Sequence, residues 1–393
     1  MFTMTRLSDE SLRFGEELAS VTLGIDTLDR RLHHYTEMAD GLVVINMGWK
    51  KVREFESCAE ARAALGELAR KTFSLPEPDR RLYYLQACLS LDSFCAFSMG
   101  QLPELTDQVG LFLHADCAPV SEAYLKERCA RLQALFDRMG YKGSLQEMTA
   151  KWEAENRVPA DKVQETMLSL MAAARKKTGE FLPLPEAEYT CAVEKGGAFS
   201  ARSDYNHLRV VVNIEPDYTL QSLKHLVGHE AYPGHYMQFT MRREYYEQGY
   251  GAADGLLSVC NHSSSSTFEG IADMGVRMMG WIKDDNDRAF EILSEIKSAM
   301  GTASSYQKNV LQWTDSQVRD YMHKWPMLGG EGAVRSRLRF VGDPSRAALI
   351  WSYWRGDQAV SGVLDRVEAK DMDRYLDYAY GRLHTPASLQ LFH

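Results

Sequence analysis

Residues 208–235, LRVVVNIEPDYTLQSLKHLVGHEAYPGH, contain two kinds of pattern within one short stretch. The β-branched run from Leu208 to Ile214 is typical of a strand. After a turn signal at Pro216, apolar residues recur at helical spacing, at Leu220, Leu223, Leu226 and Val227. The stretch therefore predicts a short strand that leads directly into a helix.

The chain on either side of this stretch is mostly helical in pattern. Upstream, Ser121 precedes an apolar stripe that Gly140 ends, and Ser144 with Glu147 forms a capping-box pattern. Residues Tyr189–Val193 predict one further strand. We therefore predict a mainly α fold with one small antiparallel β-sheet, which directly precedes the helix described above.

Length and charge limit the classes of function. With 393 residues the chain can bury a sizeable core without disulfides or a structural metal, so a metal would be present for chemistry. The net charge of -9 argues against a nucleic-acid partner, which requires a basic face. The cysteines are scattered, Met1–Ser20 lacks the apolar core of a signal peptide, and the sequence has no long apolar run. We therefore predict a cytoplasmic protein with no membrane partner.

The helix after the strand carries two adjacent residues that a metal hydrolase needs, His229 and Glu230. Zinc in such enzymes takes imidazole and carboxylate ligands and keeps an open position for water, with a carboxylate base beside that water. Adjacent helical positions can supply one ligand and one base. We therefore predict His229 as a zinc ligand and Glu230 as the general base.

Two histidines compete for the place of the second ligand. His235 follows His229 by six residues, which on a regular helix leaves it about 120° around the axis. Pro233 removes a backbone N–H and Gly234 adds backbone freedom, so a break there would bring His235 back toward His229. His225 lies four residues before His229, on the same helical face without distortion. The pattern alone leaves both histidines open.

A third ligand is predicted on a later helix. Glu269 and Asp273 are four residues apart, so they lie on one face of that helix. A zinc-bound histidine usually gives its second N–H to a carboxylate. We assign Glu269 as the third zinc ligand and Asp273 as the carboxylate that orients a histidine.

These motifs resemble the signature of a bacterial family of gluzincin-like metallopeptidases with an HExxPGH motif, domain of unknown function family 885. The resemblance extends over most of residues 181–366 and rests on four stretches, 203–213, 225–238, 269–273 and 339–356. It implies a large helical metallopeptidase-like domain. We assign residues 181–393 to the catalytic metal-binding region and residues 1–180 to an N-terminal helical region, a covering lobe continuous with it.

The resemblance also implies two histidine ligands, a carboxylate ligand and a base, namely His229, His235, Glu269 and Glu230. It places His225 behind the ligands rather than on the metal. This chain departs from the family at Tyr236, where the family has a second histidine, so we expect a different substrate contact at that position.

Three other polar residues are candidates for contact with the substrate. Asn213 ends a strand whose edge would receive a substrate backbone, and the alternative is a turn role before Pro216. Tyr353 would donate a hydrogen bond to the developing oxyanion. Arg355 would bind a substrate carboxylate. For both of these residues the alternative is packing in a helix.

Together these residues predict a zinc-dependent hydrolase, most simply a metallopeptidase that cleaves short peptides with metal-activated water. Two alternatives stay open. One is a metal-dependent amidohydrolase or lyase that acts on a non-peptide metabolite, and the other is an inactive binding protein of the same fold. The intact Glu230 argues against the second. The expected partners are zinc and a small peptide or amide substrate.

Overall fold

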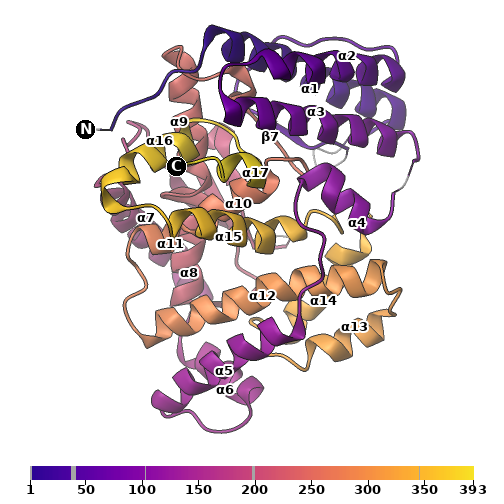
Figure 1. Ribbon diagram of the computed structural model, residues 1–393. Helices are drawn as coiled ribbons and strands as arrows, with labels where there is room; N and C mark the ends of the chain where they lie inside the picture. Colours follow the sequence, from indigo (N-terminus) through magenta and orange to yellow (C-terminus); the bar gives the residue numbers. More distant parts are fainter. Residues whose placement is uncertain (1, 37–40, 102, 197–199, 345) are drawn as a thin grey trace. The chain divides into compact units, whose positions relative to one another are not determined.

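The computed structural model describes residues 2–36, 41–101, 103–196, 200–344 and 346–393 (Figure 1). Most of these residues are helical, so the predicted mainly α class is confirmed. The chain forms two compact units, each assembled from separate stretches of sequence. Unit 1 comprises Met1–Cys117, Met237–Ile271 and Arg355–His393, and unit 2 comprises Ala118–Tyr236 and Ala272–Trp354.

Unit 1 is built on three long helices that pack side by side, α1 (Asp9–His33), α2 (Cys58–Lys71) and α3 (Pro78–Ser98) (Figure 1). Apolar residues at helical spacing on α1 turn one face into the core, and these are Phe14, Leu18, Val21, Ile25 and Leu28. The shorter elements of unit 1 are β1 (Val44–Asn46), α4 (Leu105–Gln108), β7 (Leu257–Val259), α16 (Met372–Gly381) and α17 (Pro386–Leu389).

The central helix of unit 2 is α12 (Asp285–Asn309), which packs against α5 (Glu122–Arg138) and α14 (Gly330–Gly342). The predicted capping box of Ser144 and Glu147 is present at the start of α6 (Leu145–Glu155). The core includes Leu132, Phe136, Trp152, Ile296 and Met300. The other elements include α7 (Val163–Thr178), α8 (Leu220–Leu226), α11 (Gly275–Met278), α13 (Asp315–Met322), β2 (Arg157–Val158) and β6 (Tyr218–Thr219).

The chain passes from one unit to the other at four points. Three of them lie within the helices α9 (His235–Glu247), α10 (Ser265–Asp273) and α15 (Trp351–Leu364), and the fourth lies between Cys117 and Ala118, outside any helix. Each predicted metal or substrate residue beyond position 230 lies on one of these helices. Residues that are neighbours on one helix can therefore belong to different units.

The sheet before the predicted metal helix differs from the antiparallel pair expected from the sequence. Its strand order is β3-β5-β4, formed by β3 (Thr190–Glu194), β4 (Ala201–Asp204) and β5 (Arg209–Asn213). β4 forms in the expected loop and pairs antiparallel with β5, whereas β3 pairs parallel with β5 on the other side. Because a short turn returns the chain from β4 to β5, β4 takes the antiparallel place beside β5.

Candidate metal centre

The helix that carries the predicted ligands is interrupted where the sequence predicts a break. α8 begins after its N-cap Thr219 and continues as a single π-helical segment, η5 (Val227–Ala231). The next helix, α9, begins only at His235. Pro233 and Gly234 occupy the break, and proline there cannot supply the N–H that would continue the helix.

The backbone at Gly234 approaches the preceding turn too closely for any side chain. A Cβ atom on Gly234 would lie 1.8 Å from the carbonyl oxygen of His229 and 2.4 Å from that of Gly228. Only glycine fits at such a distance. The return of the chain brings the imidazole rings of His229 and His235 together, with centroids 4.5 Å apart and planes at 78°. The expected effect of the Pro-Gly break is therefore confirmed.

Asp273 holds the His229 ring in one orientation. Nδ1 of His229 lies 2.6 Å from Oδ1 of Asp273, and Nε2 of His225 lies 3.5 Å from the same oxygen. Two ligands of one tetrahedral zinc ion lie about 3.3 Å apart, given bonds of about 2.0 Å. The shorter distance fits a hydrogen bond and not two ligands of a shared metal. Nδ1 of His229 therefore faces Asp273, and Nε2 is the nitrogen that would take a metal.

His225 contacts the same carboxylate and lies away from the break. Its ring packs 5.7 Å from the ring of Phe290 and 5.6 Å from that of His229, measured between centroids. Burial lowers the pKa of His225 to about 4, against the opposing charge of Asp273, so its imidazole is neutral at neutral pH. These contacts suit a residue that supports His229 through Asp273.

His235 is buried, and its backbone is held by a second element. The Tyr205 hydroxyl donates to the backbone carbonyl of His235 at 3.0 Å. Its ring presents a nitrogen within 4.8 Å of a ring nitrogen of His229. The two histidines are thus close enough for small side-chain adjustments to give both a bond to one ion.

Glu269 lies on α10, four residues before Asp273 in the same continuous helix. Positions four apart lie one turn from each other on one helical face. Glu269 is therefore on the face of α10 that presents Asp273, although it is counted with unit 1 and Asp273 with unit 2.

Glu230 is buried beside a serine that the sequence did not single out. Ser203, on β4, donates its hydroxyl to Oε2 of Glu230 at 2.7 Å. Burial raises the pKa of the nearby Tyr189 hydroxyl, and the charge of Glu230 raises it further. The sequence could not identify Ser203 as a site residue. It lies 27 residues before Glu230, and only the pairing of β4 with β5 brings the two together.

Tyr236 and Asn213 each make internal contacts. The Tyr236 hydroxyl donates to the carbonyl of Ala187 at 2.9 Å, and its ring stacks on Tyr189 with centroids 4.2 Å apart. Oδ1 of Asn213 accepts the N–H of Glu215 at 3.0 Å, which is the hydrogen bond of a turn. The Asn213 carboxamide therefore acts in a turn, which was the alternative role considered for this residue in the sequence analysis.

The predicted use of the strand 208–214 as a docking edge for substrate is wrong. β5 is the central strand of its sheet and pairs with β3 on one side and β4 on the other. Its backbone N–H and C=O groups are therefore committed within the sheet, and strand addition needs an open edge.

Tyr353 and Arg355 lie two residues apart but belong to different units. Tyr353 is half-buried in the first turn of α15 and interacts electrostatically with Arg337 of unit 2. Arg355 belongs to unit 1, where its guanidinium pairs with Asp116 at 3.1 Å and donates to Gln358 at 2.8 Å. The substrate roles of both residues stay predictions.

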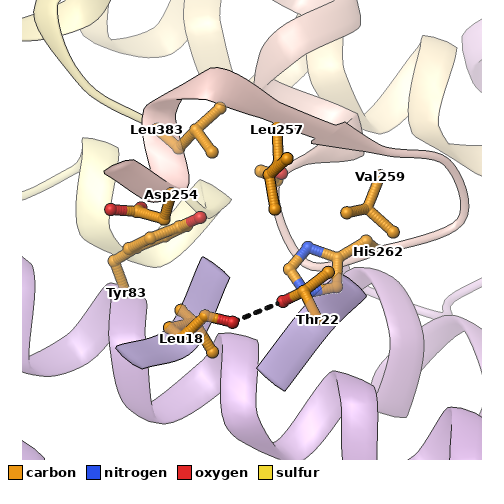
Figure 2. Close-up of a pocket in the computed structure, with 9 residues that line it drawn as sticks. Leu18, Thr22, Tyr83, Asp254, Leu257, Val259, His262 and Leu383 are labelled. Carbon is orange, nitrogen blue, oxygen red and sulfur yellow. Dashed lines mark hydrogen bonds between the residues drawn. The ribbon is translucent and has the colours of Figure 1, made fainter. Parts of the chain in front are cut away.

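Unit 1 contains a small cavity of its own, shown in Figure 2. Its volume is about 20 Å³, which is room for one water molecule and not for a peptide. The lining includes His262 and Thr22, and the Thr22 hydroxyl donates to the carbonyl of Leu18 at 2.8 Å. Burial lowers the pKa of His262 to about 3. This cavity does not compete as a substrate site.

Two solved structures share the fold. One is described as the "putative lipoprotein from Colwellia psychrerythraea", with 14% identity, a TM-score of 0.59, and 84% of this chain and 68% of that chain covered. The other is "a putative lipoprotein of unknown function from Shewanella oneidensis", with 13% identity, a TM-score of 0.52 and coverage of 85% and 70%. Identities this low show a common fold alone. No protein-family model and no curated protein matches the chain.

The comparisons correct two predictions. The assignment to domain of unknown function family 885 is wrong, because no family model matches and neither similar structure is described as a metallopeptidase. The predicted cytoplasmic location is wrong as well, because both structures of like fold are described as lipoproteins. Among the described helices, none is long and apolar enough to cross a membrane.

We predict that Gly234→Ala separates His235 from His229 and reduces zinc binding at least about 10-fold, because the new methyl group would overlap the His229 carbonyl. Zinc affinity, measured by competition with a chromophoric chelator, checks this. The matched control is Gly66→Ala on α2, where a Cβ meets nothing closer than 3.9 Å. The control should leave zinc affinity unchanged and stabilise the fold by about 0.5–1 kcal/mol. Unchanged zinc binding in Gly234→Ala would contradict the account of the break.

Proposed function

We propose that the chain is a zinc-dependent hydrolase that cleaves amide bonds in short peptides. His229, His235 and Glu269 are the proposed ligands, and Glu230 is the proposed general base. Asp273 and His225 orient the ligands from behind. The proposal rests on the residues of the site and not on family membership.

The observation that carries the proposal is the orientation of His229. Its Nδ1 is 2.6 Å from a carboxylate while its ring stands 4.5 Å from a second imidazole. Histidines that bind metals characteristically give their second nitrogen to a carboxylate in this way. The adjacent residue in the chain is a buried glutamate, which is the base that a zinc hydrolase requires.

A bound zinc ion would lower the pKa of a water molecule to about 7 and polarise the substrate carbonyl. In the proposed reaction the Glu230 carboxylate accepts the proton of the attacking water and delivers it to the leaving nitrogen. The Ser203 hydroxyl, 2.7 Å from Oε2 of Glu230, fixes which carboxylate oxygen points toward the substrate. Tyr353 is the proposed donor to the oxyanion.

The ligand assignment predicts different results for two histidine variants. Protein purified without chelator should contain about one zinc per chain. His235→Ala should abolish tight zinc binding, because it removes a ligand. His225→Ala should weaken zinc binding by roughly 10–100-fold, as expected for a residue that acts through Asp273. Elemental analysis and chelator competition measure both effects, and the reverse ranking would assign the ligand role to His225.

Glu230→Gln should retain zinc and fold but lose at least about 100-fold in hydrolysis, because the amide cannot accept a proton. A panel of N-acylated dipeptides, followed by chromatography, provides the assay. The matched control is the exposed Glu188→Gln, which should hydrolyse at the parent rate. If Glu230→Gln turns over a substrate as fast as the parent does, the assigned base is wrong. If it loses zinc while Glu269→Gln keeps zinc, the two carboxylates have been exchanged.

A further inference from the structure

One face of α12 leads from the metal centre to a pair of cations in unit 2. Phe290, Lys297 and Gly301 share this face because their spacings are seven and four residues. Phe290 packs against His225 of α8. About three turns further along α12, the Arg337 guanidinium lies against Gly301, where a Cβ atom would be 2.8 Å from Nη1 of Arg337. Lys297 therefore lies between His225 and Arg337.

Lys297 has solvent access and is desolvated at the same time. Its side chain is exposed, yet the surrounding protein lowers the pKa of its ammonium, and Arg337 lowers it further. Arg337 is half-buried, and desolvation lowers the pKa of its guanidinium as well. Both cations are therefore partly desolvated by protein and still accessible to a small solute.

Within the ranges that the structure describes, neither cation forms an ion pair or a hydrogen bond. The charges of Asp273 and Glu153 act on Lys297 from beyond ion-pair distance and favour its charged form. Lys224, a cation on the neighbouring α8, is paired with Asp287 of α12 at 2.7 Å. Two neighbouring like charges that are partly desolvated and form no ion pair cost free energy, and a bound anion would offset that cost.

The pair lies within electrostatic range of the metal centre. The charge of Asp273, which orients His229, favours the charged form of Lys297. The charge of Lys297 in turn contributes to the low pKa of His225. On the far side, Tyr353 interacts with Arg337. The two cations therefore interact with ionisable groups on both sides, with Asp273 at the histidines and with Tyr353, the proposed oxyanion donor.

We propose that Lys297 and Arg337 bind a carboxylate of the substrate beside the metal centre. This deepens the proposed function, on which it rests. The substrates are then amides that carry a free carboxylate near the scissile bond, such as N-acylated amino acids or the C-terminal residues of short peptides. Arg337 supplies the planar fork that pairs with a carboxylate, and Lys297 supplies a point charge next to it.

Binding of N-acetylglycylglycine and of its C-terminal amide, measured by isothermal titration calorimetry, tests the proposal. The full chain is used as purified and again after treatment with chelator, so that binding to the cation pair is separated from binding to a metal. The parent protein should bind the carboxylate form at least about 10-fold more tightly than the amide in both states. Lys297→Met and Arg337→Met should each remove that preference.

Matched controls lie on the same two helices. Lys308→Met on α12 loses a surface pair with Asp315, and Arg335→Met on α14 changes an exposed arginine, so both should keep the carboxylate preference. Thermal unfolding verifies that each variant is folded. Equal binding of the carboxylate and the amide by the parent, or an intact preference in both Met variants, would overturn the proposal. Tighter binding of inorganic phosphate than of the carboxylate would also overturn it. Because metal-free protein is measured as well, failure of the carboxylate test would not contradict the zinc site. In the same way, an absence of zinc would not contradict the carboxylate subsite.

Discussion

The candidate site depends on a close backbone contact at three glycines. Gly234 folds back onto the carbonyl oxygens of Gly228 and His229, where a side chain has no room. Gly275 also approaches Gly228 closely, because a Cβ atom on Gly275 would lie 2.4 Å from the carbonyl oxygen of Gly228. The first contact brings His235 to His229. The second fixes the start of α11, two residues after Asp273, and so holds that carboxylate against His229.

The hydrogen bonds around each side chain then determine the role that we propose for it. The 2.6 Å hydrogen bond to Asp273 occupies Nδ1 of His229 and leaves Nε2 as the face for a metal. The 2.7 Å hydrogen bond from Ser203 orients the neighbouring carboxylate of Glu230. Lys297 on α12, the helix that packs against His225, and Arg337 on α14 add two positive charges that form no ion pair within the described residues. The proposed hydrolysis of a carboxylate-bearing amide would use these features as ligand orientation, a positioned base and a site for an anion.

The local parts of this arrangement could be predicted from the sequence, and the long-range parts could not. The strand-to-helix pattern, the capping box at Ser144 and the break at Pro233 are encoded by residues within a few positions of each other. The parallel pairing of β3, the central place of β5 and the arrival of Ser203 at Glu230 depend on which strands meet. Lys297 and Arg337 are 40 residues apart and carry no motif, so only the packing of α12 against α14 reveals them. The assignment to a peptidase family, based on a few short motifs, was wrong, because no family model matches the chain.

The most direct test of the central claim is anomalous diffraction at the zinc edge, from crystals of protein purified without chelator. The account predicts one strong peak about 2.0–2.1 Å from Nε2 of His229 and from a ring nitrogen of His235, with a carboxylate oxygen of Glu269 as third ligand. A peak between His225 and Asp273, or no peak near His229 after soaking in zinc, would contradict it.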